Sequence, residues 1–151
     1  MQNWPLPWEH REYSGELRCW FMTDFTEPAI SAAEAIEIGV PLLAEHAATL
    51  RVIIASLGSD NGLSIDEIDD LKLAVSEVFT VLIDHAADSG RALIRYWAET
   101  GTIRIHLTND VDDHVLELDT LAQAILSSVV DEYTVSSDGV MLVKRNRELL
   151  A

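Results

Sequence analysis

The stretch of sequence that decides the fold is residues 64–86, which read SIDEIDDLKLAVSEVFTVLIDHA. Its apolar residues recur every three or four positions, which is the period of an amphipathic helix. Ser64 and Glu67 stand three residues apart ahead of the apolar run, and this spacing is typical of a capping box, in which each side chain binds a free backbone N–H of the first turn. The sequence therefore predicts a long central helix that begins after Ser64 and runs to about Ala87.

Shorter periodic segments lie on both sides of this helix. In chain order the predicted elements are a strand at 35–40, a helix at 42–57, the central helix at 64–87, strands at 92–97 and 103–107, a helix at 118–130, and strands at 132–135 and 140–144. We expect Pro41 to end the first strand, Gly58 to end the first helix, and glycine-containing turns to join the paired strands as hairpins. This order predicts an α/β (α+β) two-layer sandwich with a mostly antiparallel sheet and helices on one face.

The composition excludes several classes of function. The chain has 151 residues, 48% of them apolar, and a formal net charge of −16. A surface this acidic repels a phosphate backbone, so direct binding of nucleic acid is not expected. It either speeds encounter with a basic protein partner or serves solubility alone. The acids between residues 59 and 70 are open to the same two interpretations, a docking surface for a basic helix or a helix start stabilised by its dipole.

Disulfides, metal sites and membrane spans are not predicted. Cys19 is the single cysteine, so it can form neither an intramolecular disulfide nor a cysteine zinc cluster. His46 and His85 lie on predicted helices without further His or Cys residues at ligand spacing. No apolar run approaches the length of about 20 residues that spans a bilayer, and no basic region followed by an apolar run opens the chain. We therefore expect a soluble cytoplasmic protein.

One domain with an N-terminal arm is predicted. Residues 1–34 form an N-terminal arm that contains aromatic residues and proline, and residues 35–151 form the α/β domain. The arm either packs on its own domain through its aromatic rings or grips a partner.

Three segments resemble one known family. Residues 70–86 resemble the first ATP-site helix of anti-sigma regulatory serine kinases, a branch of the histidine-kinase-like ATPase superfamily. Residues 129–133 and 139–145 are similar to the exit of the last helix and the terminal hairpin of that family. The resemblance covers roughly residues 35–147 and implies the histidine-kinase-like (Bergerat-type) ATPase fold. It also implies sigma-factor sequestration, release by an anti-anti-sigma protein, and homodimers.

The family binds ATP and magnesium through three sequence boxes, and this chain departs from each. A Glu that activates the reacting hydroxyl is followed one helical turn later by an Asn that holds Mg²⁺; here Glu77 is followed by Val81, which has no oxygen ligand. The Asp-x-Gly-x-Gly turn corresponds to residues 109–114, where Asp110 stands in the adenine-binding position but glycine is absent. The glycine-rich entry to the last helix corresponds to residues 119–123, which also lack glycine.

These departures favour a regulator that sequesters a sigma factor or a related transcription regulator, without ATP, metal or kinase activity. Glu77, Val81 and Asp110 would then be vestiges of the ATP site. The alternative is an active serine/threonine kinase that phosphorylates an anti-anti-sigma factor with ATP and Mg²⁺, with Glu77 as base and Asp110 reading adenine. A third hypothesis is a domain whose partner has changed, with the aromatic arm as the new contact.

Overall fold

The computed structural model describes residues 35–86, 90–99, 101–110 and 116–149. The predicted arm, residues 1–34, lies outside the described residues. The elements are β1 (Ile36–Pro41), a short 3₁₀ helix η3 (Ala44–His46), α1 (Ala47–Asp60), α2 (Ile65–His85), β2 (Arg91–Glu99), β3 (Thr102–Asn109), α3 (Thr120–Val129), β4 (Glu132–Ser136) and β5 (Gly139–Arg145). Their order is the one that the sequence predicts.

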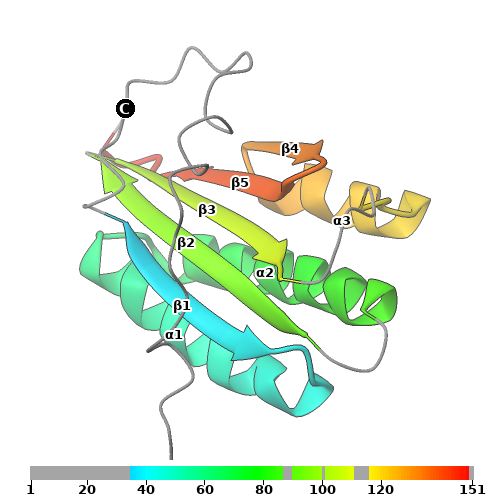
Figure 1. Cartoon of the computed structure of the whole chain (residues 1–151). Helices are drawn as coiled ribbons and strands as arrows, with labels where there is room; N and C mark the ends of the chain where they lie inside the picture. Colours follow the sequence, from blue (N-terminus) through cyan, green and yellow to red (C-terminus); the bar gives the residue numbers. More distant parts are fainter. Residues whose placement is uncertain (1–34, 87–89, 100, 111–115, 150–151) are drawn as a thin grey trace, which may run out of the picture. The chain divides into compact units, whose positions relative to one another are not determined.

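The strands form one five-stranded sheet in the order β1-β2-β3-β5-β4, and every neighbouring pair is antiparallel. Figure 1 shows the three α-helices on one face of this sheet. Along β2 and β3 the buried side chains alternate with partly exposed ones because successive residues of a strand point to opposite faces. The buried set faces the helices and includes Ile94, Ile105 and Leu107. The predicted α+β class with a mostly antiparallel sheet is confirmed.

Helix α2 is the central helix of the domain and packs against both α1 and α3. Its apolar stripe is almost completely removed from solvent, with Leu71, Val78 and Phe79 at 0% exposure. Each such side chain contributes about 1.5–3 kcal/mol through burial. The capping box is present as predicted, since the Ser64 and Glu67 side chains each bind the other residue's backbone N–H. Packing and capping together hold α2 in one position under the sheet.

The predicted end of the first helix is wrong. Gly58 lies buried inside α1, which continues past it. A Cβ at Gly58 would lie 3.1 Å from Cγ1 of Ile68, so glycine lets α1 approach α2 closely. The helix ends instead at Asp60, and Gly62, with φ of 75°, closes it: the N–H groups of Gly62 and Leu63 donate to the carbonyls of Ser59 and Gly58, each at 3.0 Å. This pair of bonds is a Schellman motif.

The hairpin of β4 and β5 depends on another glycine. Gly139 has φ of 129°, and a Cβ there would stand 2.1 Å from the carbonyl oxygen of Leu107 on β3. Only glycine fits this position, since any side chain would push β5 away from β3. Within the described ranges, none of the helices is both long enough and apolar enough to span a bilayer.

Candidate functional site

Glu77 and Val81 lie in the second half of α2, four residues apart and therefore on one face of the helix. Both side chains are half-buried, and Val81 packs against the hydrophobic core. In the described part of the chain, the Glu77 carboxylate makes no hydrogen bond or ion pair. The pair thus offers one carboxylate free to bind a proton, a donor or a cation, beside an apolar surface that has no ligand atom.

Asp110 follows β3 and is used by the sheet. Its Oδ1 accepts a 2.6 Å hydrogen bond from the backbone N–H of Arg91, and its own N–H donates to the Arg91 carbonyl at 3.0 Å. The two bonds close the β2–β3 ladder at this end. No hydrogen bond or ion pair joins Asp110 to Glu77 within the described ranges. The acidic run that comes next, residues 111–115, lies outside those ranges.

The N-terminus of α3 is capped by an acidic side chain. Asp119 is the N-cap residue, and its carboxylate accepts a 2.7 Å hydrogen bond from the N–H of Ala122. The side chain of Gln123 turns back to donate to the Leu118 carbonyl at 2.7 Å. A carboxylate is stable here because the helix dipole places partial positive charge at this end. The family that the chain resembles has a phosphate-binding glycine turn at this position. This chain has the Asp119 carboxylate there instead.

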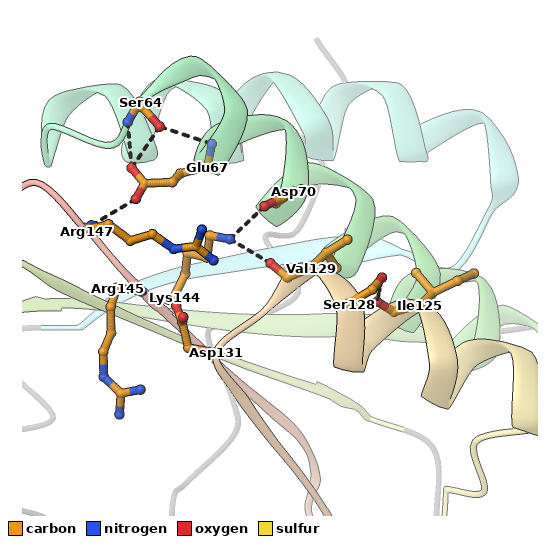
Figure 2. A network of polar contacts seen from close by, with 10 residues as sticks. All are labelled: Ser64, Glu67, Asp70, Ile125, Ser128, Val129, Asp131, Lys144, Arg145 and Arg147. Carbon is orange, nitrogen blue, oxygen red and sulfur yellow. Dashed lines mark hydrogen bonds and ion pairs between the residues drawn. The ribbon is translucent and has the colours of Figure 1, made fainter.

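A buried cation that the sequence patterns do not indicate lies at the other end of α2 (Figure 2). Lys144 on β5 is 1% exposed, and its Nζ donates to Oδ2 of Asp70 at 2.8 Å and to the carbonyl of Val129 at 2.7 Å. A buried ammonium is costly unless it is paired and hydrogen-bonded. Here one charged and one neutral acceptor take two of its three N–H groups, so the ammonium joins β5, α2 and the end of α3.

Glu67 belongs to the same network (Figure 2) and is itself buried. Its Oε2 accepts bonds from the N–H of Ser64 at 2.8 Å and the Ser64 hydroxyl at 2.9 Å, and its Oε1 accepts from the N–H of Arg147 at 2.9 Å. Burial raises the pKa of Glu67. The hydrogen bonds from Arg147 and Ser64 lower it by more than burial raises it, so the net pKa lies below the ordinary 4.5. The spacing of Ser64 and Glu67 predicts the first partner; no local signal points to Arg147, 80 residues away.

The network bears on the acids between residues 59 and 70. Glu67 and Asp70 are engaged as described, and Asp69 pairs with Lys72 at 2.7 Å on the surface of α2. Glu67 and Asp70 therefore serve the helix start and its tertiary bonds, and Asp69 serves a pair within the helix, which favours the structural interpretation of the acidic stretch over the docking one.

The two histidines considered as metal ligands make local contacts. Nε2 of His46 lies 3.8 Å from the neighbouring Glu45 carboxylate, and Nδ1 of His85 lies 2.8 Å from the Val81 carbonyl. Across the described residues, no three His, Cys, Asp or Glu side chains gather closely enough to hold a metal ion.

Comparison with known proteins places these features in a family. The family model described as the histidine kinase-like ATPase domain matches residues 40–143. Among curated proteins, the serine-protein kinase RsbW of Halalkalibacterium halodurans is 37% identical over 57 residues, which is 38% of this chain and 35% of that protein. RsbW of Bacillus cereus strain AH187 is 38% identical over 53 residues, 35% of this chain and 33% of that protein. The chain thus spans about a third of the length of these relatives.

A solved structure shares the fold. The crystal structure of the RsbU and RsbW domains of a Mycobacterium tuberculosis protein superposes with a TM-score of 0.55 at 17% identity, covering 75% of this chain and 32% of that one. At this identity the likeness concerns the fold alone. The family match runs from the last residues of β1 into β5, and so includes α1, α2, α3 and most of the sheet. The chain therefore belongs to the histidine kinase-like ATPase domain family.

Proposed function

We propose that this chain is an anti-sigma-factor-like regulator, which sequesters a sigma factor or a related transcription regulator by protein–protein binding, without binding ATP or acting as a kinase. The observation that carries the proposal is Val81, one helical turn after Glu77 and packed on the core. Mg²⁺ needs hard oxygen ligands, and valine offers none. An ATP phosphate group would therefore lack its bridging ion at this helix.

The N-terminus of α3 supports the same proposal. In the family that the chain resembles, free N–H groups at this point bind phosphate. Here the Asp119 carboxylate already accepts a hydrogen bond from the N–H of Ala122. A triphosphate placed there would meet a like charge, and Asp119 would have to give up its cap. The residues of this site do not suit ATP with magnesium.

Asp110 and the net charge complete the argument. Oδ1 of Asp110, the residue that the resemblance assigns to the adenine amine, already accepts a 2.6 Å bond from the backbone N–H of Arg91. The chain has a net charge of −16, which attracts basic partners electrostatically and repels polyphosphates. A protein partner with a basic surface therefore fits this domain better than a nucleotide does.

The direct test is calorimetric titration of the protein with a non-hydrolysable ATP analogue and Mg²⁺. We expect no detectable heat, because three positions lack the required groups. Val81→Asn restores one magnesium ligand and should regain at most weak binding, while Thr80→Asn, an exposed neighbour on the same helix, serves as the matched control. Micromolar binding by the unmodified protein would contradict the proposal.

The protein-binding half of the proposal needs its own measurement. Purified sigma factors and anti-anti-sigma proteins from the native host would be titrated against the immobilised chain at several salt concentrations. We expect one of them to bind, with affinity that falls as salt rises because the chain is strongly acidic. Failure of every candidate to bind would count against the regulator.

The second candidate is an active serine/threonine kinase, and the similarity to serine-protein kinase RsbW favours it. In that case Glu77 would accept the proton of the substrate hydroxyl. Transfer of labelled γ-phosphate to an anti-anti-sigma protein, abolished by Glu77→Gln, would establish this activity and replace the first proposal.

A further inference from the structure

The outermost strand β4 presents an open backbone edge. It pairs with β5 on one side and is the last strand in the order of the sheet, beside α3 (Figure 1). An edge strand leaves half of its N–H and C=O groups without a strand partner, and these groups can accept another strand. Apart from the partly buried Tyr133, the side chains of β4 are exposed. The edge is therefore accessible within the described domain.

A pocket lies beside this edge. It has a volume of about 470 Å³ and is lined by Glu117, Leu118, Gln123, Tyr133 and Val135. Tyr133 and Val135 pair with the buried residues Leu142 and Val140, so they lie on the helix side of β4. Val135 is nevertheless 36% exposed. Tyr133 and Val135 give the pocket an apolar side along β4, whereas Glu117 and Gln123 give it a polar one.

The charge around the edge is mainly negative. Four described acids lie at or beside this edge. Glu117 lines the pocket, Asp131 and Glu132 lie at the start of β4, and Asp138 lies in its turn. Arg145 of β5 pairs with Glu132, and its backbone N–H donates to Asp131, so one cation faces these acids. A second copy docked edge to edge would bring these acids together, whereas a basic segment would be attracted.

We propose that the β4 edge and its pocket bind an extended segment of a partner protein in which apolar and basic side chains alternate. The segment adds a strand to β4, its apolar side chains enter the pocket, and its basic side chains lie on the opposite face, near Glu132. Backbone bonds to the edge supply the register, and the pocket selects the apolar positions. Neither Glu77 nor Val81 lines this surface, so the inference goes beyond the proposed function and holds whichever regulator the domain sequesters.

The test uses a fluorescein-labelled peptide in which lysine and valine alternate, titrated against the full chain by fluorescence anisotropy. A peptide of the same composition, with lysines and valines in separate blocks, is the control for charge alone. We expect the alternating peptide to bind with a dissociation constant at least about tenfold lower. In ¹⁵N-resolved NMR spectra the shifted amides should centre on Tyr133, Thr134 and Val135.

Two variants localise the binding. Val135→Gln and Thr134→Gln place the same neutral amide at neighbouring positions, but Val135 faces the pocket and Thr134, which pairs with Met141, faces the other side of the sheet. We expect Val135→Gln to weaken binding at least about tenfold and Thr134→Gln less than about threefold. Circular dichroism and urea denaturation check that both variants fold.

Three results would overturn the inference. These are no preference for the alternating peptide, equal weakening by the two variants, and amide shifts that centre on another part of the chain. A dimer of the unmodified protein that Val135→Gln dissociates, detected by gel filtration with light scattering, would assign the edge to a second copy instead.

Discussion

The two halves of α2 use charged residues in different ways. In the first half, Glu67 and Asp70 bind groups that lie 80 and 74 residues further along the chain. In the second half, Glu77 makes no such bond within the described residues, and Val81 adds only apolar packing. An acidic residue on this helix is therefore no sign of chemistry by itself. Its tertiary partners separate a structural carboxylate from one that is available.

Removing the buried ammonium of Lys144 should destabilise the domain more than any other substitution considered for α2 and its partners. We expect Lys144→Met to lower the free energy of unfolding by about 2–3 kcal/mol, because the Val129 carbonyl and Asp70 would lose their shared donor while the side-chain volume is kept. Urea denaturation measures the change. Lys72→Met is the matched control, since Lys72 pairs with Asp69 on the surface and should cost less than about 1 kcal/mol. Equal losses of unfolding free energy in the two variants would show that the buried bonds of Lys144 stabilise the fold no more than a surface ion pair does.

The next largest effect should come from Glu67, and it depends on pH. Glu67→Gln should cost about 1–2 kcal/mol at pH 7, since bonds to Ser64 and Arg147 would lose their charged acceptor. The pKa of Glu67 is lowered in the folded state, so its contribution is fully present above pH 4.5 and is lost as pH falls through the folded-state value. The difference in unfolding free energy between the two proteins should therefore shrink as pH falls below 4.5. A difference that does not shrink in this acidic range would contradict the assignment.

Ser76 marks the middle of α2 and should give an intermediate effect. Its hydroxyl is buried, accepts a 2.8 Å bond from Nε of Arg51 on α1, and donates to the Lys72 carbonyl at 2.7 Å. We expect Ser76→Ala to lower the free energy of unfolding by about 1 kcal/mol. In a double-mutant cycle with Arg51→Met, the two losses should not add, because both remove the same bond. Additive losses would mean that the bond contributes nothing.

The smallest effect should be at Glu77. We expect Glu77→Gln to change the free energy of unfolding by less than about 0.5 kcal/mol, since no described group depends on that carboxylate. Urea denaturation of Glu77→Gln and Glu67→Gln under the same conditions compares the two carboxylates within one helix. A loss as large as that of Glu67→Gln would show a structural role for Glu77 and remove it from the candidate site.

The fold was largely predictable because its signals are local. Periods of two and of three to four residues fix the strands and helices, and the spacing of Ser64 and Glu67 fixes the start of α2. The role of Gly58 was not predictable, since a glycine that ends a helix and one that admits a neighbouring helix look alike in sequence. Only the contact with Ile68 distinguishes them.

The candidate site was predictable in its positions and less so in its contacts. Resemblance located Glu77, Val81 and Asp110, but the bond that Asp110 makes to Arg91 joins two strands, and its geometry appears only once they are paired. In the sequence, nothing distinguishes Lys144 from any other lysine near the end of a strand. Its burial depends on α2 and α3 meeting over β5, which no local pattern encodes.

The reach of the network around Lys144 and Glu67 has a consequence for folding kinetics. Its bonds close loops of 74 and 80 residues, so they can form only after the sheet has brought β5 under α2. We expect them to be weak in the folding transition state and complete in the native state. Substitutions of Lys144 or Glu67 should then accelerate unfolding while leaving the folding rate nearly unchanged. The bonds of these two residues would thereby prolong the lifetime of the native domain.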